Sequence, residues 1–454
     1  MPPDAQAVLP QTAYSTSVGL APGRGYRILV GTVIVLGLTA MLFAMLNGDL
    51  FRPIRHAIEQ GNLGASLLKP SLIWIAMALL MLALRTVLWF SYRPFDAATH
   101  ESAPTMTVVI PAYNEGAMVE QSIESVAAAR YPSGRLEILV VDDGSTDDTW
   151  TYIQRAASRH LGLVTAVKLE RNQGKRAALA TGFRAARGDV LVTIDSDSVI
   201  DAGALLAMAG PFRDPRVGAV AGKVAAFNRD KGFIPRMLHV RYILSFDFLR
   251  SVQSTYRTVY CCPGALAGYR ASVVRAVLES WLGQRFLGAR CTYGEDRALT
   301  NFILDRGFDT VYQGSAVVHT LVPDTYTKLC KMYLRWERSY VREEIRFLRI
   351  VWKRPLVPMV LAIFEKLITN LRFPVAWTAT ATLAVIAISE PLALVRVLIA
   401  IGVGAGFYML YYVYSERSMR FVHGILYAYF AFFTLWWIFP YAVLTVRSRS
   451  WMTR

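Results

Sequence analysis

Hydrophobic positions gather in long runs at both ends of the chain, whereas the middle alternates short apolar segments with helical patterns. Residues 28–46 and 72–90 each approach the ~20 apolar residues that a membrane-crossing helix needs. Residues 355–446 are again nearly all apolar, and their pattern fits three or four further membrane helices. The pattern therefore predicts two membrane helices within residues 24–95, a globular middle and a C-terminal helical bundle.

Two C-terminal stretches leave the number of spans open. Residues 356–371 contain Glu365, Lys366 and Asn370, so they form either an interfacial helix or the lower half of a span that bends at Pro374. Residues 421–446 either cross the bilayer or dip into it and return. Arg85 falls inside the second N-terminal run, and we expect its long side chain to reach back to the membrane surface.

The middle of the chain, residues 104–322, repeats β-rich runs followed by helical stretches. This is the βαβ rhythm of an open, mostly parallel sheet, which binds ligands at the carboxyl ends of its strands. Three predicted strands end in polar clusters, and these are Tyr113-Asn114-Glu115, Asp142-Asp143-Gly144-Ser145 and Asp195-Ser196-Asp197. One acidic strand end is often only a helix cap, but three along one edge indicate a ligand site.

Two amphipathic stretches bracket this middle part. Residues 233–252 mix aromatic and aliphatic side chains with arginine, and residues 323–354 carry arginines at spacings of three and four. Their other side is apolar and aromatic. Both stretches are expected to form helices on the inner surface of the membrane, pressing the middle domain against the spans.

Composition and charge agree with a membrane protein. The chain has 454 residues, of which 54% are hydrophobic, and its formal net charge is +16. The basic residues follow the edges of the membrane runs, which favours a cytoplasmic domain and basic tail (447–454) over nucleic-acid binding. All 4 cysteines lie between the two apolar ends of the chain, without the spacing of a zinc site, and are expected to be reduced. The polar lead, residues 1–23, is expected to be disordered.

The acidic strand ends suggest a metal-held diphosphate. The sequence has neither a glycine-rich dinucleotide motif nor a P-loop. Residues two apart on an extended segment point the same way, so Asp195 and Asp197 can reach one ion. Carboxylates suit Mg²⁺, which usually binds one or two of them together with substrate phosphates. A solvated acidic turn is the alternative.

Six motifs in order carry a family resemblance. They are "VVIPAYNE", "VVDDGSTDDT", "RNQGKRAAL", "TIDSDS", "YGEDRALTN" and "LRWERSY". Together they resemble the family 2 processive membrane glycosyltransferases, in the branch of hyaluronan synthases and rhizobial chitooligosaccharide synthases (N-acetylglucosaminyltransferases). The resemblance implies an α/β GT-A (Rossmann-like) cytoplasmic domain inserted in a transmembrane helical bundle. It also implies inverting transfer from a UDP-sugar, with UDP-N-acetylglucosamine favoured, to a growing polysaccharide.

The resemblance also assigns roles to residues. For the UDP-sugar it implies Tyr113, Glu115, Asp142, Asp143, Lys175, Arg176 and Asp195. For a Mg²⁺ or Mn²⁺ ion it implies Asp197 and Asp195. It makes Asp296 the general base, with Arg335 and Trp336 as the end of the family's QxxRW motif. For the acceptor groove it implies Cys262, Gly264, Glu295, Arg297 and Tyr340. The side chain of Glu295, at a helix start, is expected to point away from that of Asp296.

One departure and several alternatives remain. The family usually has glutamine where this chain has Met332 and Tyr333, which puts the sugar specificity in question. The first alternative is a hyaluronan synthase that also uses UDP-glucuronate. The second is a non-processive transferase that loads a lipid carrier, and the third is a transporter or scaffold without catalysis. The expected partners are the UDP-sugar, the polysaccharide and membrane lipid, with the chain in the inner (plasma) membrane.

Overall fold

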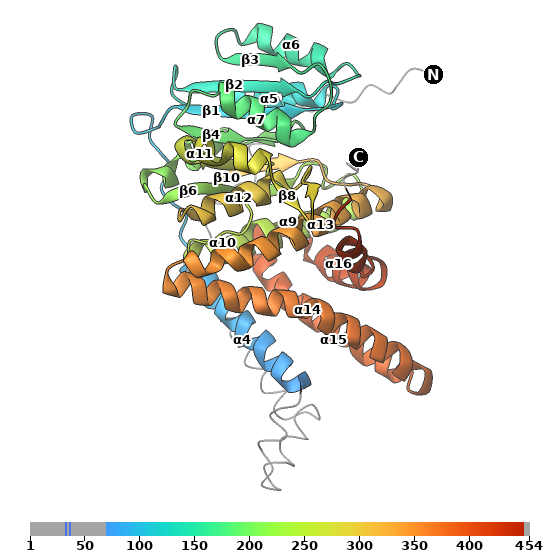
Figure 1. Ribbon diagram of the computed structural model, residues 1–454. Helices are drawn as coiled ribbons and strands as arrows, with labels where there is room; N and C mark the ends of the chain where they lie inside the picture. The colour runs from blue at the N-terminus through green and yellow to red at the C-terminus, as the bar shows by residue number, and fades with distance from the viewer. Residues whose placement is uncertain (1–31, 34–35, 38–69, 449–454) are drawn as a thin grey trace, which may run out of the picture.

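The computed structural model describes residues 32–33, 36–37 and 70–448. The predicted lead (1–23), most of the first apolar run and the tail beyond Ser448 lie outside this part of the chain. A sheet domain occupies one end of the molecule, and the helices α4 (Pro70–Ser91), α14 (Leu356–Ser389) and α15 (Leu392–Glu416) project from the other (Figure 1).

An eight-stranded mixed sheet forms the domain, in the order β3-β2-β1-β4-β7-β6-β10-β5. Strands β3, β2, β1 and β4 are parallel, β7 is antiparallel to β4 and β6, and β5 is antiparallel to β10. The strand bounds are β1 (Met106–Ala112), β2 (Leu136–Asp142), β3 (Val164–Lys168), β4 (Val190–Thr193), β5 (Ser198–Ile200), β6 (Val217–Ala226), β7 (Ala267–Arg270) and β10 (Asp309–Thr320). A separate hairpin joins β8 (Arg285–Phe286) to β9 (Ala289–Arg290).

Helices cover both faces of the sheet, which explains why its central strands are buried throughout. Along β1, Val108 and Ile110 face one core while Val109 faces the other. The first core includes side chains of α5 (Met118–Ala127), α6 (Thr149–Arg159) and α8 (Ala204–Ala209), which the 3₁₀ turn Gly210–Arg213 follows. The second includes α7 (Lys175–Ala185), α11 (Ala271–Leu282) and α12 (Glu295–Asp305).

Two helical layers separate the sheet from the projecting helices (Figure 1). One consists of α9 (Phe233–Ile243), a π-helical turn (Leu244–Phe248) and α10 (Leu249–Thr255), and the other is α13 (Tyr326–Ile350), followed by the 3₁₀ turn Val351–Lys353. The arginine side of α13 packs on protein: Arg338 and Arg342 are 4% and 3% exposed. They donate to the Thr445 hydroxyl at 3.0 Å and to the Tyr293 carbonyl at 2.6 Å.

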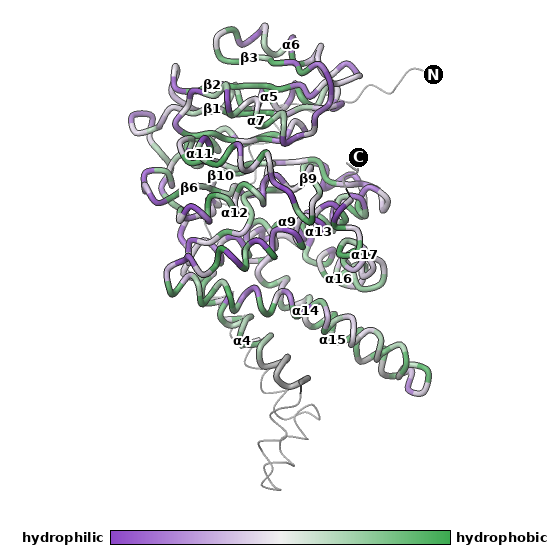
Figure 2. The backbone as a smooth tube through the Cα atoms, viewed as in Figure 1, coloured by the Kyte–Doolittle hydropathy of each residue, from purple (hydrophilic) through white to green (hydrophobic). Residues whose placement is uncertain are grey.

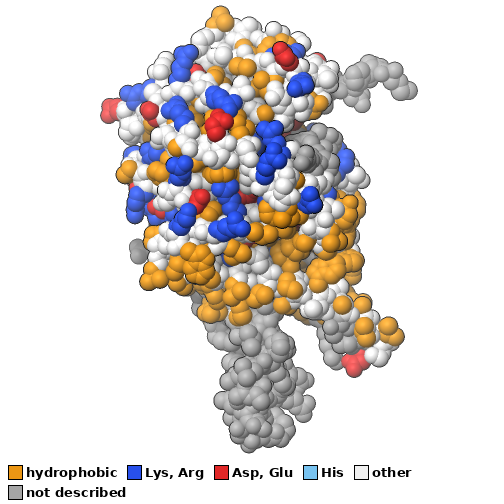
Figure 3. All heavy atoms as spheres, in the orientation of Figure 1, with side chains coloured by type: hydrophobic (Ala, Val, Ile, Leu, Met, Phe, Trp, Pro, Cys, Tyr) orange, Lys and Arg blue, Asp and Glu red, His pale blue; other side chains and the backbone are white. Residues whose placement is uncertain are grey.

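The C-terminal region has two helices long and apolar enough to cross a membrane, or three if a bent pair counts as one span. Residues 356–371 belong to the continuous helix α14, and Pro374 lies inside it. The bent pair is α16 (Phe421–Thr434) with α17 (Ile438–Leu444), at an angle of 51°. Hydrophobic residues dominate these helices (Figure 2), and hydrophobic side chains cover the surface around them while Lys and Arg gather over the sheet domain (Figure 3).

The polar residues near the base of α14 have partners inside the protein. Glu365 pairs with Arg85 of α4 at 3.2 Å, and their side chains are only 7% and 14% exposed. Tyr256, the residue after α10, also donates to Glu365, and Lys366 pairs with Glu344 of α13. The expectation that Arg85 reaches out to the membrane surface is therefore wrong, because a carboxylate on another helix holds it inside.

Candidate active site

The loops after β1 and β2 are joined by hydrogen bonds. Asp142, fully buried at the end of β2, accepts from the backbone N–H and the hydroxyl of Ser145, at 3.1 and 2.5 Å. The same hydroxyl accepts from the backbone N–H of Asn114 at 3.0 Å. Tyr113 and Glu115, on either side of Asn114, are half-buried. The first two predicted polar clusters therefore lie side by side at one edge of the sheet.

Asp143 ties this edge to the start of α7. Its carboxylate accepts from the backbone N–H groups of Gln173 and Gly174, each at 2.8 Å. Burial raises the pKa of Asp143, and these two donors act against that rise. The neighbouring Gly144 has φ +72°, and a Cβ there would lie 2.6 Å from the backbone of Arg171. Only glycine fits this close crossing of two loops, which fixes the start of α7.

Lys175, the first residue of α7, stands among three acids. Its Nζ lies 2.5 Å from Oδ1 of Asp195 and 3.2 Å from Oε1 of Glu295. Burial alone would lower the pKa of Lys175, but the charges of Asp195, Glu295 and the nearby Asp296 outweigh it, so the pKa is raised. The amine therefore stays charged and links the end of β4 to the start of α12.

Asp197 lies deeper at the same edge. It is 3% exposed, and its Oδ1 accepts from the hydroxyls of Ser198 at 3.0 Å and Thr320 at 3.1 Å. Among the described residues, no group of three or more His, Cys, Asp or Glu side chains could hold a metal ion by itself. The donors present suit a hard divalent ion that takes the rest of its ligands from substrate oxygens.

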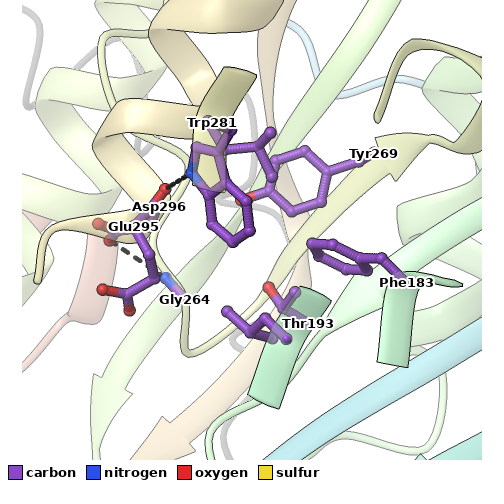
Figure 4. Close-up of a pocket in the computed structure, with 9 residues that line it drawn as sticks. Phe183, Thr193, Gly264, Tyr269, Trp281, Glu295 and Asp296 are labelled. Atoms are coloured by element: carbon purple, nitrogen blue, oxygen red, sulfur yellow. Dashed lines mark hydrogen bonds between the residues drawn. The ribbon is translucent and has the colours of Figure 1, made fainter. Parts of the chain in front are cut away.

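Asp296 and Glu295 begin α12 and face different partners (Figure 4). Asp296 Oδ2 accepts from the backbone N–H of Gly264 at 3.3 Å and contacts the Cys261 thiol at 3.6 Å. Burial and the charge of Glu295 raise the pKa of Asp296, whereas for Glu295 the pull of Lys175 outweighs burial and lowers the pKa. Neighbouring acids whose pKa values shift in opposite directions recur in catalytic acid–base sites.

The RW motif of α13 approaches this edge through α9. Trp336 packs against Tyr242 and Phe246, with ring centroids 6.0 and 6.3 Å apart. Burial raises the pKa of Tyr242, Arg335 lowers it and Asp195 raises it, so both charges lie near this ring. Arg335 and Trp336 are each half-buried. The structure thus brings the motif close to the acids of the sheet edge.

Two further acceptor candidates, Arg297 and Tyr340, lie between Asp296 and α14. The Arg297 guanidinium sits 5.3 Å from the ring centroid of Tyr340, whose hydroxyl donates to Asn370 of α14 at 2.7 Å. The residues that replace the family's glutamines are both 8% exposed. Met332 accepts from the Tyr242 hydroxyl at 3.5 Å, and Tyr333 pairs with Tyr427 at 2.7 Å, so both positions serve helix packing here.

Two predicted site residues are buried in the protein interior, although Arg176 lies near enough to Glu295 for their charges to interact. Arg176 is 4% exposed and donates to the Trp281 carbonyl at 2.9 Å and to Gln284 at 3.0 Å, which joins α7 to α11. Cys262 is fully buried in the core, whereas Cys261 contacts Asp296. Neighbouring residues of an extended segment face opposite ways. The adjacent cysteine pair therefore indicated that only one of the two faces the site, but not which one.

Comparison with known proteins places the chain in a family. Residues 107–278 match the model of "Glycosyl transferase family 2". The chain is 30% identical over 396 residues to an N-acetylglucosaminyltransferase of Rhizobium meliloti, covering 83% of this chain and 89% of the relative. The chain belongs to glycosyl transferase family 2.

Other relatives match over a shorter length. An N-acetylglucosaminyltransferase of Azorhizobium caulinodans is 37% identical, with 54% of this chain and 62% of the relative covered. A hyaluronan synthase of Streptococcus pyogenes is 35% identical, with 61% and 66% covered. The chain thus spans somewhat less than two thirds of the length of these two relatives.

A solved structure supports the fold. A mannosyltransferase from Pyrobaculum calidifontis, in complex with GDP-Man and Mn²⁺, aligns with a TM-score of 0.56 at 23% identity. The alignment covers 79% of this chain and 98% of that chain. The predicted GT-A glycosyltransferase fold, with helices that can span a membrane, is confirmed, and so is the predicted family branch.

Proposed function

We propose that the protein is a processive, inverting glycosyltransferase that polymerises a β-linked polysaccharide from a UDP-sugar, with UDP-N-acetylglucosamine favoured. The observation that carries the proposal is the meeting of Lys175, Asp195, Glu295 and Asp296 at one sheet edge. Helix α12, which begins with Glu295 and Asp296, packs beside α13, between the sheet and the projecting helices (Figure 1). Two relatives named N-acetylglucosaminyltransferase support the favoured donor.

The donor half of the site is the edge formed by β1, β2 and β4. Tyr113, Glu115, Asp142 and Asp143 would hold the uridine on the joined loops. A Mg²⁺ or Mn²⁺ ion would be held by Asp197 and Asp195 and would neutralise charge on the diphosphate. Lys175, Arg335 and this ion would together stabilise the departing UDP.

The acceptor half begins at Asp296. Its carboxylate would take the proton of the attacking hydroxyl while the sugar–phosphate bond breaks on the opposite side, which inverts the anomeric carbon. General-base assistance of this kind is worth ~10²–10⁴ in rate. The raised pKa of Asp296 suits that role, because a stronger base accepts the proton more readily. Gly264, Glu295, Arg297, Trp336 and Tyr340 would shape the acceptor groove.

The membrane helices suggest where the product goes. We place the catalytic domain on the cytoplasmic side of the inner (plasma) membrane, where UDP-sugars are made. A polymer that grows at Asp296 would leave past Tyr340 and Asn370 into the helical bundle and be extruded. The contact between Arg297 and Tyr340, and that between Tyr340 and Asn370, mark the direction from base to bundle.

The donor sugars that the protein consumes distinguish between the candidate activities. Purified full-length protein with Mg²⁺ or Mn²⁺ is given UDP-N-acetylglucosamine alone, UDP-glucuronate alone, or both, and released UDP is measured. Release with the first donor alone, and a long product that chitinase digests, is the expected result. A product that needs both donors and is cut by hyaluronidase would show the hyaluronan synthase that the Streptococcus relative suggests. A product of one sugar on a lipid would refute processivity.

Asp296→Asn tests the proposed base. Binding of the UDP-sugar should persist, because the amide keeps the shape of the side chain, while turnover falls ~10²–10⁴-fold. Asp324→Asn, at a carboxylate 51% exposed, is the matched control and should leave turnover unchanged. Near-normal turnover of Asp296→Asn would remove this residue from the role. Extrusion is tested in sealed vesicles, where polymer confined to the UDP-sugar side would contradict it.

A further inference from the structure

The position of Asp296 depends on how helix α12 begins. The chain enters this helix at Gly294, which has φ +70°, and a Cβ at that point would overlap the side chain of Ser339 in α13. Only glycine therefore fits between the turn and α13. One residue earlier, the carbonyl of Tyr293 accepts from the guanidinium of Arg342 in α13 at 2.6 Å. The turn that leads into the proposed base is thus held against α13.

The residue after Arg342 is Glu343, an acid that is only 1% exposed. Its Oε1 accepts from Nε of Arg342 at 3.0 Å and from Nε2 of Gln284 at 2.8 Å. Its Oε2 accepts from Nδ2 of Asn301 at 3.1 Å, and the same amide group donates to the Glu343 carbonyl at 3.0 Å. Three donors therefore satisfy the buried charge, and they join α13 to α12 and to the segment that follows α11.

The hydrogen bonds continue from Gln284 to the other side of α12. Oε1 of Gln284 accepts from Arg176, the second residue of α7, at 3.0 Å. Arg176 also donates to the Trp281 carbonyl at 2.9 Å, and the Trp281 indole N–H donates to the Glu295 carbonyl at 3.0 Å (Figure 4). A continuous series of hydrogen bonds thus runs from α13 through α7 and α11 to the first residue of α12.

We propose that Glu343 is a positioning residue that sets where the carboxylate of Asp296 lies. It acts through Arg342, which holds the turn before the base, and through Asn301, which lies further along the same helix as the base. Asp296 accepts from the backbone N–H of Gly264 at 3.3 Å, already long for such a bond, so a small shift of α12 would break it. The inference rests on the proposed function, in which a base displaced by about 1 Å can cost ~10²-fold in rate.

Glu343→Gln is the decisive variant, because it keeps the size of the side chain and removes its charge. An amide offers one oxygen and one NH₂ group, so at least one of the three donors would face another donor. We expect kcat for UDP release to fall roughly 10-fold, because the base is misplaced. The KM for the UDP-sugar should stay within about twofold of wild type, since the loops after β1 and β2 keep their own contacts.

A rescue and a matched control accompany this variant. The double variant Gln284→Glu with Glu343→Gln moves the charge to the other end of the same hydrogen bond, and the new carboxylate still accepts from Arg176. Its kcat should recover to within about threefold of wild type. Asp309→Asn is the control, since Asp309 is also buried and accepts from two arginines, at 2.6 and 2.7 Å, beside the start of α14. It should lower Tm and leave kcat unchanged.

The kinetic results can overturn the inference in two ways. A kcat for Glu343→Gln within about twofold of wild type would do so, and so would an equal loss of kcat in Asp309→Asn. If Glu343→Gln does not fold, Gln284→Leu takes its place, because it removes one donor at a half-buried position. That variant should lower kcat roughly threefold with KM unchanged, and a wild-type kcat would again overturn the inference.

Cryo-EM maps of full-length wild type and Glu343→Gln give a readout that does not depend on activity. The Asp296 carboxylate should move away from the Gly264 backbone in the variant, and an unchanged position would overturn the inference. If wild type releases no UDP with any donor, the proposed function fails, whereas the maps still test whether Glu343 positions Asp296.

Discussion

Breaking the buried ion pair between Arg85 and Glu365 should destabilise the junction between the catalytic domain and the membrane helices. The pair joins α4 to α14, two helices separated by 280 positions in the chain. Three variants define the experiment: Arg85→Met, Glu365→Gln and both together. Each single substitution leaves one buried charge without its oppositely charged partner, whereas the double substitution removes both charges.

The size of the effect follows from the burial and partners of the two groups. The side chains of Arg85 and Glu365 are 14% and 7% exposed, and removing one partner of a buried pair costs about 3–5 kcal/mol. In Arg85→Met, Glu365 keeps uncharged donors, Tyr256 and Gln253, so the loss should be about 3 kcal/mol. In Glu365→Gln, the cation is left without its carboxylate, and we expect up to about 5 kcal/mol. The double variant should lose no more than the worse single variant.

Thermal unfolding of the detergent-solubilised protein measures the loss of stability in each variant. For a chain of this length, a loss of about 3 kcal/mol corresponds to a fall of roughly 3 °C in Tm, and the two single losses should not add in the double variant. The surface pair Arg184–Glu279, with side chains 52% and 77% exposed, is the control and should contribute at most about 1 kcal/mol. Tm values within about 1 °C of wild type for both single variants, or strictly additive losses, would refute the reasoning.

Three further results are expected. Gly144→Ala should raise the KM for the UDP-sugar severalfold in steady-state assays, because a Cβ at φ +72° would push apart the loops that hold the nucleotide; an unchanged KM would contradict this. Glu295→Gln should move the acidic limb of the kcat–pH profile to lower pH, because the Glu295 charge raises the pKa of Asp296 and its loss lets Asp296 stay ionised in more acid. A limb that moves to higher pH would contradict it. EDTA should abolish UDP release and Mn²⁺ restore it, and Asp197→Asn should need more Mn²⁺ for half-maximal rate; activity indifferent to EDTA would exclude the metal.

The sequence predicted the acidic edge because that edge depends on local signals. Carboxyl ends of parallel strands share an edge, so the clusters after β1, β2 and β4 had to lie near one another. The antiparallel strand β7 (Ala267–Arg270), which lies between β4 and β6, was not predicted. Short buried strands rich in alanine and glycine lack the usual β-branched pattern.

Other differences arise from partners distant in sequence. Arg85 lies in an apolar run, and nothing near it in the sequence indicates that its ion-pair partner is Glu365 of another helix. The position of Arg176 could have been predicted, because successive residues on a helix face different ways and Lys175 already faces the acids. The buried Thr193 hydroxyl, which has no hydrogen-bond partner among the described residues, could not have been predicted, since its surroundings depend on how α11 and α12 pack over β4.

The polar base of α14 has a consequence for how the chain is made. Glu365 and Lys366 find their partners on Arg85 and Glu344, which leave the ribosome earlier. Lipid alone would receive these two charges poorly, at several kcal/mol each. Glu365 and Lys366 therefore have buried partners only once α4 and α13 are in place. A chain in which α13 has not yet folded would expose the charge of Lys366 to the bilayer.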